Sequence, residues 1–295
     1  MTEVSSPRWL VVGAGGMLGR DVVALLETRG LKHRALTRAE LDLTDAAAVE
    51  QAVFGSEIVI NAAAWTDVDG AETHEAEATA INGEAVRNLA LACAQNDIRL
   101  LTVSTDYVFP GDATEPIAED APTAPINAYG RGKLIGERAL LEALPETGYL
   151  VRTAWLYGRH GKNFVATILN AAAQREFLDV VDDQQGQPTS TPALSRQLLA
   201  LGRAAHAGRA PAGVYHGTCA GRTTWFGLAR AAFELTGLDP ERVRPTTSEK
   251  FVRPAPRPAY SVLGHERWAG AGLTPMPDWH ETLRGYLAPA AETEV

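Results

Sequence analysis

Tyr129 and Lys133 are the side chains of this sequence whose types and spacing most clearly suit them to chemistry. They are four residues apart, so a helix that begins after Asn127 would place both on one face. An isolated tyrosine has a pKa of about 10, and a cation close by favours the tyrosinate. The positive end of the helix, which Asn127 is suited to cap, acts in the same direction. The pair predicts a proton-transfer group, although Tyr-x-x-x-Lys by itself also occurs as an ordinary surface pair.

A strand end is expected to bring a third polar group to this pair. The apolar run Arg-Leu-Leu-Thr-Val (99–103) predicts a buried strand, and Ser-Thr-Asp-Tyr-Val-Phe (104–109) follows it directly. The Thr105 hydroxyl would then hold a substrate oxygen beside the phenol, as general acid catalysis requires. Thr105, Tyr129 and Lys133 are therefore the predicted catalytic residues.

The composition narrows the class of protein. The 295 residues fit one large domain or two intimate ones, and no apolar run approaches the length that spans a bilayer. The net charge of −9 argues against a nucleic-acid surface, and the N-terminus lacks the layout of a signal peptide. Cys93 and Cys219 predict buried, reduced thiols. We expect a cytoplasmic protein without a nucleic-acid or membrane partner and without a metal.

A glycine-rich turn predicts a dinucleotide site near the N-terminus. The apolar run 9–12 leads into Gly-Ala-Gly-Gly-Met-Leu-Gly (13–19) and then into an amphipathic helix that stops at Gly30. In such a turn the first glycine permits the bend, the second lets a pyrophosphate approach, and the third lets helix and strand pack closely. The alternative is a turn that binds nothing. The predicted cofactor contacts here are Gly13, Gly16, Met17, Leu18 and Gly19.

Residues after the next two strands are expected to complete the cofactor site. His33–Leu36 predicts the second strand, and Arg38 follows it where an adenosine ribose or its 2′-phosphate would lie. Arg38 favours NADPH, with NADH as the alternative, because Arg38 could be a solvated turn residue and Glu40 could reach a ribose hydroxyl. The expected adenine contacts are Asp42 and Leu43. The small residues Ala62, Ala63 and Ala64 end the third strand and would let a flat cofactor lie against the backbone.

Strands and helices alternate through the first half of the chain. This alternation predicts an α/β fold with a doubly wound parallel (Rossmann) sheet and a smaller, interleaved C-terminal substrate-binding domain. We expect the dinucleotide domain at 1–158, with 190–220 returning to the sheet, and the substrate domain mainly at 159–295. A helix at 224–236 could also return to the sheet. The proline-rich loop 110–127 is a lid candidate or a surface loop of no consequence.

Aromatic and cationic side chains later in the chain are candidates for further ligand contacts. The strand 149–155 ends in Trp155, on which a sugar ring could stack, although Trp155 could equally be a core residue. Arg253 and Arg257 lie in a proline-rich segment, where they could grip a diphosphate or be solvated.

These motifs resemble those of extended short-chain dehydrogenases/reductases and, within them, the dTDP-4-dehydrorhamnose reductase family. The resemblance extends over nearly the whole chain, and the string Ser-Thr-Asp-Tyr-Val-Phe is specific. Pro110 stands where an aspartate is common and Trp65 where a tyrosine is common. The matching segments are 13–19, 61–69, 71–72, 104–109, 119–120, 125, 129–130, 133, 136–137, 152–157, 163–164, 183–184, 186, 188–189 and 257–258.

The resemblance implies reduction of a dTDP-4-keto-6-deoxysugar at carbon 4. The nicotinamide would deliver hydride, Tyr129 would protonate the forming alkoxide, and Thr105 would bind the same oxygen. Lys133 would lower the pKa of the tyrosine and bind the nicotinamide ribose. Asp106, Tyr107, Trp155 and Arg257 would contact the substrate. The metal-linked dimer contacts of some family members cannot be placed here, and the sequence leaves a homodimer open.

Three other readings of the same motifs remain. A related deoxysugar of natural-product biosynthesis, such as a streptose- or dideoxysugar-type intermediate, could be the substrate. A non-catalytic dinucleotide-binding regulatory subunit is disfavoured because Tyr129 and Lys133 are both present. A dehydratase usually carries an acidic pair beside the threonine, whereas Asp106 is followed by Tyr107, so a dehydratase or epimerase is disfavoured too.

Overall fold

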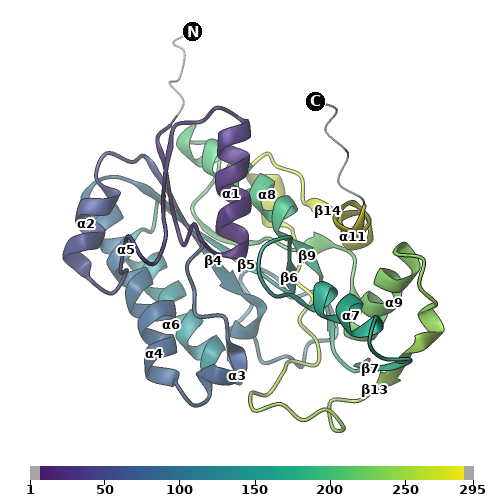
Figure 1. Cartoon of the computed structure of the whole chain (residues 1–295). Helices are drawn as coiled ribbons and strands as arrows, with labels where there is room; N and C mark the ends of the chain where they lie inside the picture. The colour runs from purple at the N-terminus through teal and green to yellow at the C-terminus, as the bar shows by residue number, and fades with distance from the viewer. Residues whose placement is uncertain (1–6, 289–295) are drawn as a thin grey trace.

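A six-stranded parallel sheet forms the centre of the computed structural model, which describes residues 7–288 (Figure 1). Its strand order is β10-β5-β4-β3-β1-β2, and every neighbouring pair is parallel. The predicted doubly wound parallel sheet is confirmed. Its strands are β1 (Trp9–Val12), β2 (His33–Leu36), β3 (Ile58–Asn61), β4 (Arg99–Thr105), β5 (Gly148–Thr153) and β10 (Gly213–His216).

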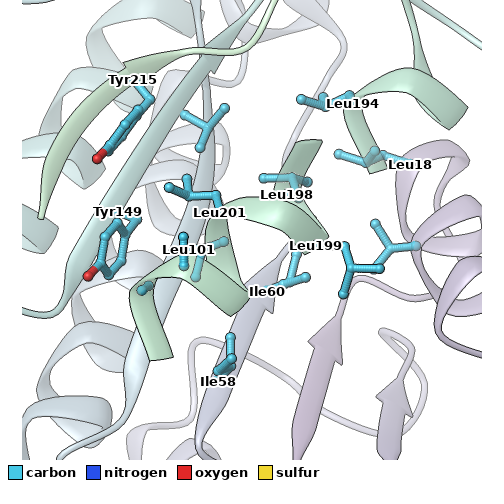
Figure 2. Packing of buried hydrophobic residues seen from close by; sticks show 14 of the residues in the cluster. Leu18, Ile58, Ile60, Leu101, Tyr149, Leu194, Leu198, Leu199, Leu201 and Tyr215 are labelled. Atoms are coloured by element: carbon cyan, nitrogen blue, oxygen red, sulfur yellow. The ribbon is translucent and has the colours of Figure 1, made fainter. Parts of the chain in front are cut away.

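Helices cover both faces of this sheet, as the alternating side chains of β1 require. Trp9 and Val11 point into one apolar cluster, and Leu10 and Val12 point into another on the opposite face. In the first cluster, leucines of α8 pack on Ile58, Ile60 and Leu101 of the strands (Figure 2). The helices of the two layers are α1 (Met17–Thr28), α8 (Thr191–His206), α2 (Ala46–Val53), α5 (Ala85–Gln95) and α6 (Ala128–Ala143).

The later part of the chain builds a smaller unit beside the sheet, around α7, α9, β7 and β13 (Figure 1). β7 pairs in parallel with β13, and their apolar side chains pack against α7 and α9. The larger elements of this part are α7 (Phe164–Ala172), β7 (Leu178–Val181), α9 (Trp225–Leu235), β13 (Val243–Thr246) and α11 (Trp279–Leu287). Its short elements are β6 (Leu156–Tyr157), β8 (Gln185–Gly186), β9 (Thr189–Ser190), β11 (Cys219–Ala220), β12 (Thr223–Thr224), η3 (Pro240–Arg242), α10 (Arg267–Gly270) and β14 (Met276–Asp278).

The chain crosses between the two units. β10 pairs with β5 at the edge of the central sheet, so part of the segment 190–220 returns to it. α9 does not return, because its buried face packs in the smaller unit, and that expectation was wrong. The domain limits remain a prediction, and their outermost residues, 1–6 and 289–295, lie outside the described part of the chain.

Two local features add to this pattern. The helical stretch between β3 and β4 is divided into α4 (Glu75–Thr79), a π-helical turn η1 (Ala80–Glu84) and α5. The loop 110–127, a lid candidate, is tied to the C-terminal segment: Ile117 is buried and its N–H donates to Val262 O. Short helices precede both: α3 (Val68–Ala71) and the 3-10 turn η2 (Asp106–Val108). Among the described helices, none is both long and apolar enough to cross a membrane.

A buried ion pair joins α6 to the sheet below the predicted site. The Arg152 guanidinium, at the end of β5, donates to the Glu137 carboxylate at 2.8 Å, and both side chains are at most 5% exposed. Ser104 Oγ donates to the same carboxylate at 2.6 Å. Since a buried charge is tolerated only when it is paired and hydrogen-bonded, this cluster fixes where α6 meets β4 and β5.

Glu137→Leu tests this connection, because it leaves the Arg152 charge buried and unpaired. We expect the free energy of unfolding to fall by about 3–5 kcal/mol, measured by urea denaturation. The double variant Glu137→Leu/Arg152→Met should recover most of that loss. As a matched control, Glu75→Leu breaks the exposed pair with Arg131 and should lower stability by no more than about 1 kcal/mol. A loss in Glu137→Leu as small as the control's would contradict the structural role.

Candidate active site

The glycine turn has the features that a dinucleotide site requires. Gly13 has a φ of +74°, and a Cβ there would lie 2.4 Å from the backbone nitrogen of Ala63. A Cβ on Gly19 would lie 2.2 Å from Gly13 O. At Gly16, the N-cap of α1, a Cβ would have only Gly13 O within 4 Å, at 3.3 Å. The close backbone contacts therefore require glycine at positions 13 and 19. At position 16, glycine instead leaves the N-terminus of α1 open to an anion.

Two of the predicted cofactor contacts are core residues. Leu18 packs in the apolar cluster beneath α1, and Leu43 packs in the cluster on the opposite face of the sheet. The Leu43 carbonyl also accepts a hydrogen bond from Asn88. Their side chains are therefore not available to a ligand, and contacts of Leu18 and Leu43 with a cofactor stay predictions that only their backbone groups can meet. Sequence reasoning missed this because both residues stand next to genuine loop positions.

Arg38 is exposed just after the end of β2. Its guanidinium makes no hydrogen bond and no ion pair with the other described residues. The nearby carboxylates are engaged locally. Glu40 accepts hydrogen bonds from the backbone N–H and the hydroxyl of Thr37, which lower its pKa. Asp42 accepts the equivalent pair from Thr44, with the same effect on its pKa. Both carboxylates therefore stay ionised at this edge, and Arg38 is the cation there that a 2′-phosphate would meet.

The alanines after β3 lie in a backbone segment that is fixed from both sides. Asn61 Oδ1 accepts from the Ala63 N–H at 3.0 Å, and Ala63 lies against Gly13. At the far end, buried Asn82 of η1 both donates to and accepts from the Trp65 backbone. Ala62, Ala63 and Ala64 are partly exposed between these anchors, as a cofactor-facing wall requires.

Helix α6 carries Tyr129 and Lys133 to the carboxyl end of β4, as predicted. Asn127 caps it by accepting from the Gly130 N–H, and Glu72 accepts from the Ala128 N–H. A Cβ on Gly130 would lie 2.2 Å from Tyr107 O, so the first turn of α6 fits directly against the end of η2. This close approach explains why glycine follows the tyrosine.

Lys133 is buried and its ammonium donates to the Val103 carbonyl at 2.7 Å. Burial lowers the pKa of Lys133 to about 8, and the Glu137 carboxylate opposes that shift. This hydrogen bond therefore holds the ammonium of Lys133 at the end of β4.

The pKa of Tyr129 is raised, which reverses the expected direction. Burial is the largest cause, and the Asp106 carboxylate adds to it, while a hydrogen bond with the Thr105 side chain opposes both. Lys133 is not among the causes. Without a ligand, this phenol therefore holds its proton firmly, and the sequence argument failed because it could not include burial.

Thr105 and Asp106 form a buried polar pair beside the phenol. Thr105 Oγ1 donates to Asp106 Oδ1 at 3.0 Å and accepts from the Tyr107 N–H at 3.2 Å. Asp106 is 3% exposed, and burial raises its pKa to about 6. The expected sugar contact of Asp106 is thus not supported in this conformation, because the carboxylate lies beneath the surface.

A cavity of about 550 Å³ opens between the two units, next to Tyr107. Apolar side chains of α7 and β7 form its inner wall, with Trp225 of α9. Tyr129 is not part of the wall but packs edge-on against Tyr107, with ring centroids 5.8 Å apart. The proposed acid therefore contacts a residue of the cavity wall and is not itself part of that wall.

Two arginines of the C-terminal segment, Arg253 and Arg257, line this cavity. Arg257 donates to Asp69 of α3 at 2.9 Å, and Arg253 lies 3.6 Å from the same carboxylate. The guanidinium of Arg257 also lies 5.9 Å from the centroid of the Tyr107 ring. The expected substrate contact of Arg257 stays a prediction, whereas Asp69 was missed, because no local pattern links residues so far apart in sequence.

Trp155 does not have the open face that a sugar would need. It stacks on Trp225 with ring centroids 3.6 Å apart, and a Cβ on Gly186 would lie 2.5 Å from its ring. Its backbone lies in the left-handed region, with a φ of +47°, which packing on both sides must hold. The expected stacking role of Trp155 does not fit, and Trp225, which sequence reasoning missed, lines the cavity instead.

The fold and this arrangement of threonine, tyrosine and lysine define an extended short-chain dehydrogenase/reductase. The family model described as RmlD substrate binding domain matches residues 8–292, and the chain belongs to this family.

Named relatives share about half of their residues with this chain. A dTDP-4-dehydrorhamnose reductase of Streptomyces griseus is 54% identical over 285 residues, which cover 96% of this chain and 94% of the relative. A dTDP-4-keto-6-deoxy-D-glucose reductase of Streptomyces niveus is 50% identical over 280 residues, covering 94% and 95%.

A solved structure of the same type contains a nicotinamide cofactor. The dTDP-4-dehydrorhamnose reductase of Bacillus anthracis in complex with NADP superposes with a TM-score of 0.89 at 34% identity, covering 95% of this chain and 98% of that one.

Asp106→Asn should stabilise the protein at neutral pH. The folded-state pKa of Asp106 is raised to about 6, so the folded protein holds this proton more tightly than the unfolded chain does. The stability that this proton contributes is complete below the unfolded pKa and is lost as pH rises through 6. At pH 7 the ionised carboxyl therefore destabilises the fold, and we expect its removal to gain about 1–3 kcal/mol.

Urea denaturation at pH 7 and at pH 4 measures this gain, which should shrink at the lower pH. Asp112→Asn, at an exposed position, serves as the control and should show no such dependence. An equal effect of Asp106→Asn at both pH values would contradict the buried, ionised carboxylate.

Proposed function

We propose that this protein reduces the 4-keto group of a dTDP-4-keto-6-deoxysugar, of the dTDP-4-dehydrorhamnose to dTDP-rhamnose type, with NADPH. The observation that carries the proposal is the convergence of Thr105, Tyr129 and Lys133 with the glycine turn at the carboxyl ends of parallel strands. Both relatives described above are named as reductases, and each matches this chain over nearly its whole length.

The residues present fit a dinucleotide. The N-terminus of α1 is free of side chains at Gly15 and Gly16, both exposed, and would hold the pyrophosphate. Arg38 would bind the 2′-phosphate of NADPH, with NADH as the weaker alternative. Ala62 to Ala64 would lie along the cofactor, and Lys133 would reach the nicotinamide ribose. Bound NADPH supplies the hydride.

The cavity beside Tyr107 suits a nucleotide diphosphate sugar. Its volume of about 550 Å³ lies within the usual range of small-molecule sites. The apolar wall that includes Ile168 and Trp225 would take the base, and Arg253 and Arg257 would hold the diphosphate. The sugar would then extend toward Tyr107 and Tyr129.

The protein's own groups would complete the chemistry. Tyr129 gives its phenolic proton to the oxygen that becomes negative as carbon 4 is reduced. Thr105 orients that oxygen, so the developing charge meets fixed polar groups. The raised pKa of Tyr129 agrees with a donor that must be protonated at the start of each turnover.

A second candidate differs only in the sugar. The relative named dTDP-4-keto-6-deoxy-D-glucose reductase is 50% identical to this chain, so a related deoxysugar of natural-product biosynthesis is the alternative substrate. A spectrophotometric assay of NADPH oxidation with a panel of dTDP-4-keto sugars distinguishes the two. Failure with every sugar would overturn the proposed function. We further expect a cytoplasmic enzyme without a nucleic-acid partner, and a homodimer is the assembly to test.

Tyr129→Phe should retain NADPH binding and lose turnover by about 10²–10⁴-fold, because only the proton donor is removed. The measurement is kcat for the best 4-keto sugar, with cofactor binding followed by fluorescence titration. Tyr149→Phe is the matched control, since its hydroxyl bonds Ala210 O near the amino end of β5, and it should stay active. Near-normal turnover in Tyr129→Phe would refute its role as donor.

Arg38→Ala should raise the KM for NADPH about tenfold and change the KM for NADH little, because only NADPH carries the 2′-phosphate. Both constants are measured with the same sugar at saturation. Arg29→Ala removes another exposed arginine, at the end of α1, and should alter neither constant. Equal effects of Arg38→Ala on the two cofactors would exclude Arg38 from phosphate recognition.

A further inference from the structure

The 2′-phosphate of NADPH would meet an unfavourable charge balance at the end of β2 if Arg38 were its only cationic partner. The segment 37–45 carries this one cation and the carboxylates of Glu40, Asp42 and Asp45. Hydrogen bonds from Thr44 lower the pKa of Asp42 most, and the nearby Arg38 charge lowers it further. A phosphate monoester carries a charge of about −1.5 to −2 at pH 7. Recognition of NADPH at this edge therefore requires a second cation from outside the segment.

Arg20 of α1 places its guanidinium against the glycine turn. Its Nε–H donates to the Gly15 carbonyl at 3.1 Å, so the side chain reaches back from the helix to the turn. A guanidinium has five N–H donors, and the bond to Gly15 uses one of them. Arg20 is exposed, and within residues 7–288 neither of its terminal nitrogens has a hydrogen-bond or ion-pair partner. These donors are therefore available to a ligand at the turn.

The turn also packs against the end of β2, which brings Arg20 and Arg38 to the same place. A Cβ on Gly15 would lie 3.5 Å from the methyl carbon of Thr37, and Arg38 follows Thr37 directly. The residue before Gly15 donates its N–H to the carbonyl of Leu36, the last residue of β2, at 3.1 Å. Gly15 thus lies between the two arginines, bonded by one and in contact with the residue that precedes the other.

Gly15 is a position at which the protein itself does not need glycine. Its φ is not positive, unlike that of Gly13. A Cβ on Gly15 would meet only Thr37, at 3.5 and 3.8 Å, which is ordinary van der Waals contact. The residue is exposed. The missing side chain therefore keeps open the space between the two arginines, as a ligand that lies across the turn requires.

We propose that Arg20 is a specificity-determining residue that, together with Arg38, holds the 2′-phosphate of NADPH from the two sides of Gly15. The inference goes beyond the proposed function and uses its assignment of Arg38 to the same phosphate. Guanidinium groups suit this task because they donate to phosphate oxygens in pairs. Arg20 keeps its Nε–H on the turn while its terminal nitrogens contact the phosphate.

The carboxylate of Glu40 explains why the second cation decides between the two cofactors. Its Oε2 accepts from both the N–H and the hydroxyl of Thr37, which fixes this negative charge at the end of β2. A carboxylate can accept a hydrogen bond from the free ribose hydroxyl of NADH, whereas it repels a phosphate. Arg20 offsets that repulsion for NADPH and adds little for NADH.

Arg20→Gln tests the proposal, because the amide can still donate to Gly15 O but carries no charge. The dissociation constants of NADPH and NADH are measured by fluorescence titration without sugar. We expect the constant for NADPH to rise about tenfold and that for NADH to change by less than about twofold. Adenosine 2′,5′-bisphosphate and adenosine 5′-monophosphate, used as competitors, should show the same difference, since they differ only in the 2′-phosphate.

Three further variants separate charge from support of the turn. Arg20→Lys keeps a cation in the same place and should retain more of the NADPH affinity than Arg20→Gln does. Arg29→Ala removes an exposed arginine at the other end of α1 and should change neither constant. The double variant Arg20→Gln/Arg38→Ala should bind NADPH no more tightly than NADH.

Two results would overturn the proposal. An equal rise of both dissociation constants in Arg20→Gln would mean that Arg20 only supports the turn, and unchanged NADPH binding would mean that it does not meet the phosphate. Because the titrations contain no sugar, either result is distinct from failure of the proposed function, which shows as absent NADPH oxidation with every 4-keto sugar.

Discussion

The contact between α6 and the carboxyl ends of β4 and β5 is the constraint on which the site depends. Lys133 donates to a backbone carbonyl of β4, and Glu137, one turn further, pairs with Arg152 of β5. These bonds are buried, so a lost partner would leave a desolvated charge. The helix therefore has one position along the strand end, and that position puts Tyr129 beside Thr105. Small residues on α6, such as Gly130 and Gly136, permit the close approach.

The burial that fixes the position of α6 also shifts the pKa values of the titratable groups in the site. Lys133 loses basicity, while Tyr129 and Asp106 hold their protons more tightly than in water. An ionised carboxylate in this setting destabilises the fold, and the protein retains it next to the phenol. Such a compromise is characteristic of functional sites, where perturbed pKa values and reduced stability occur together.

The cavity beside Tyr107 is assembled from distant segments. Asp69 lies shortly after Ala62 to Ala64, Arg257 belongs to the C-terminal segment, and Trp225 comes from the smaller unit. Asp69 pairs with Arg257, and both line the cavity. Under the proposed function, a diphosphate at Arg257 would compete with this carboxylate, which would link its binding to the position of the C-terminal segment.

The sequence by itself determined the parallel sheet, the glycine turn, the cap at Asn127 and the placement of Tyr129 and Lys133 on one helix. Each follows from local periodicity or from spacing within a few residues. Only the tertiary structure decided that Leu18 and Leu43 are core, that Trp155 is enclosed by Trp225 and Gly186, and that the Tyr129 pKa is raised. These properties depend on desolvation and on contacts between segments far apart in the chain, and neither leaves a local pattern in one sequence.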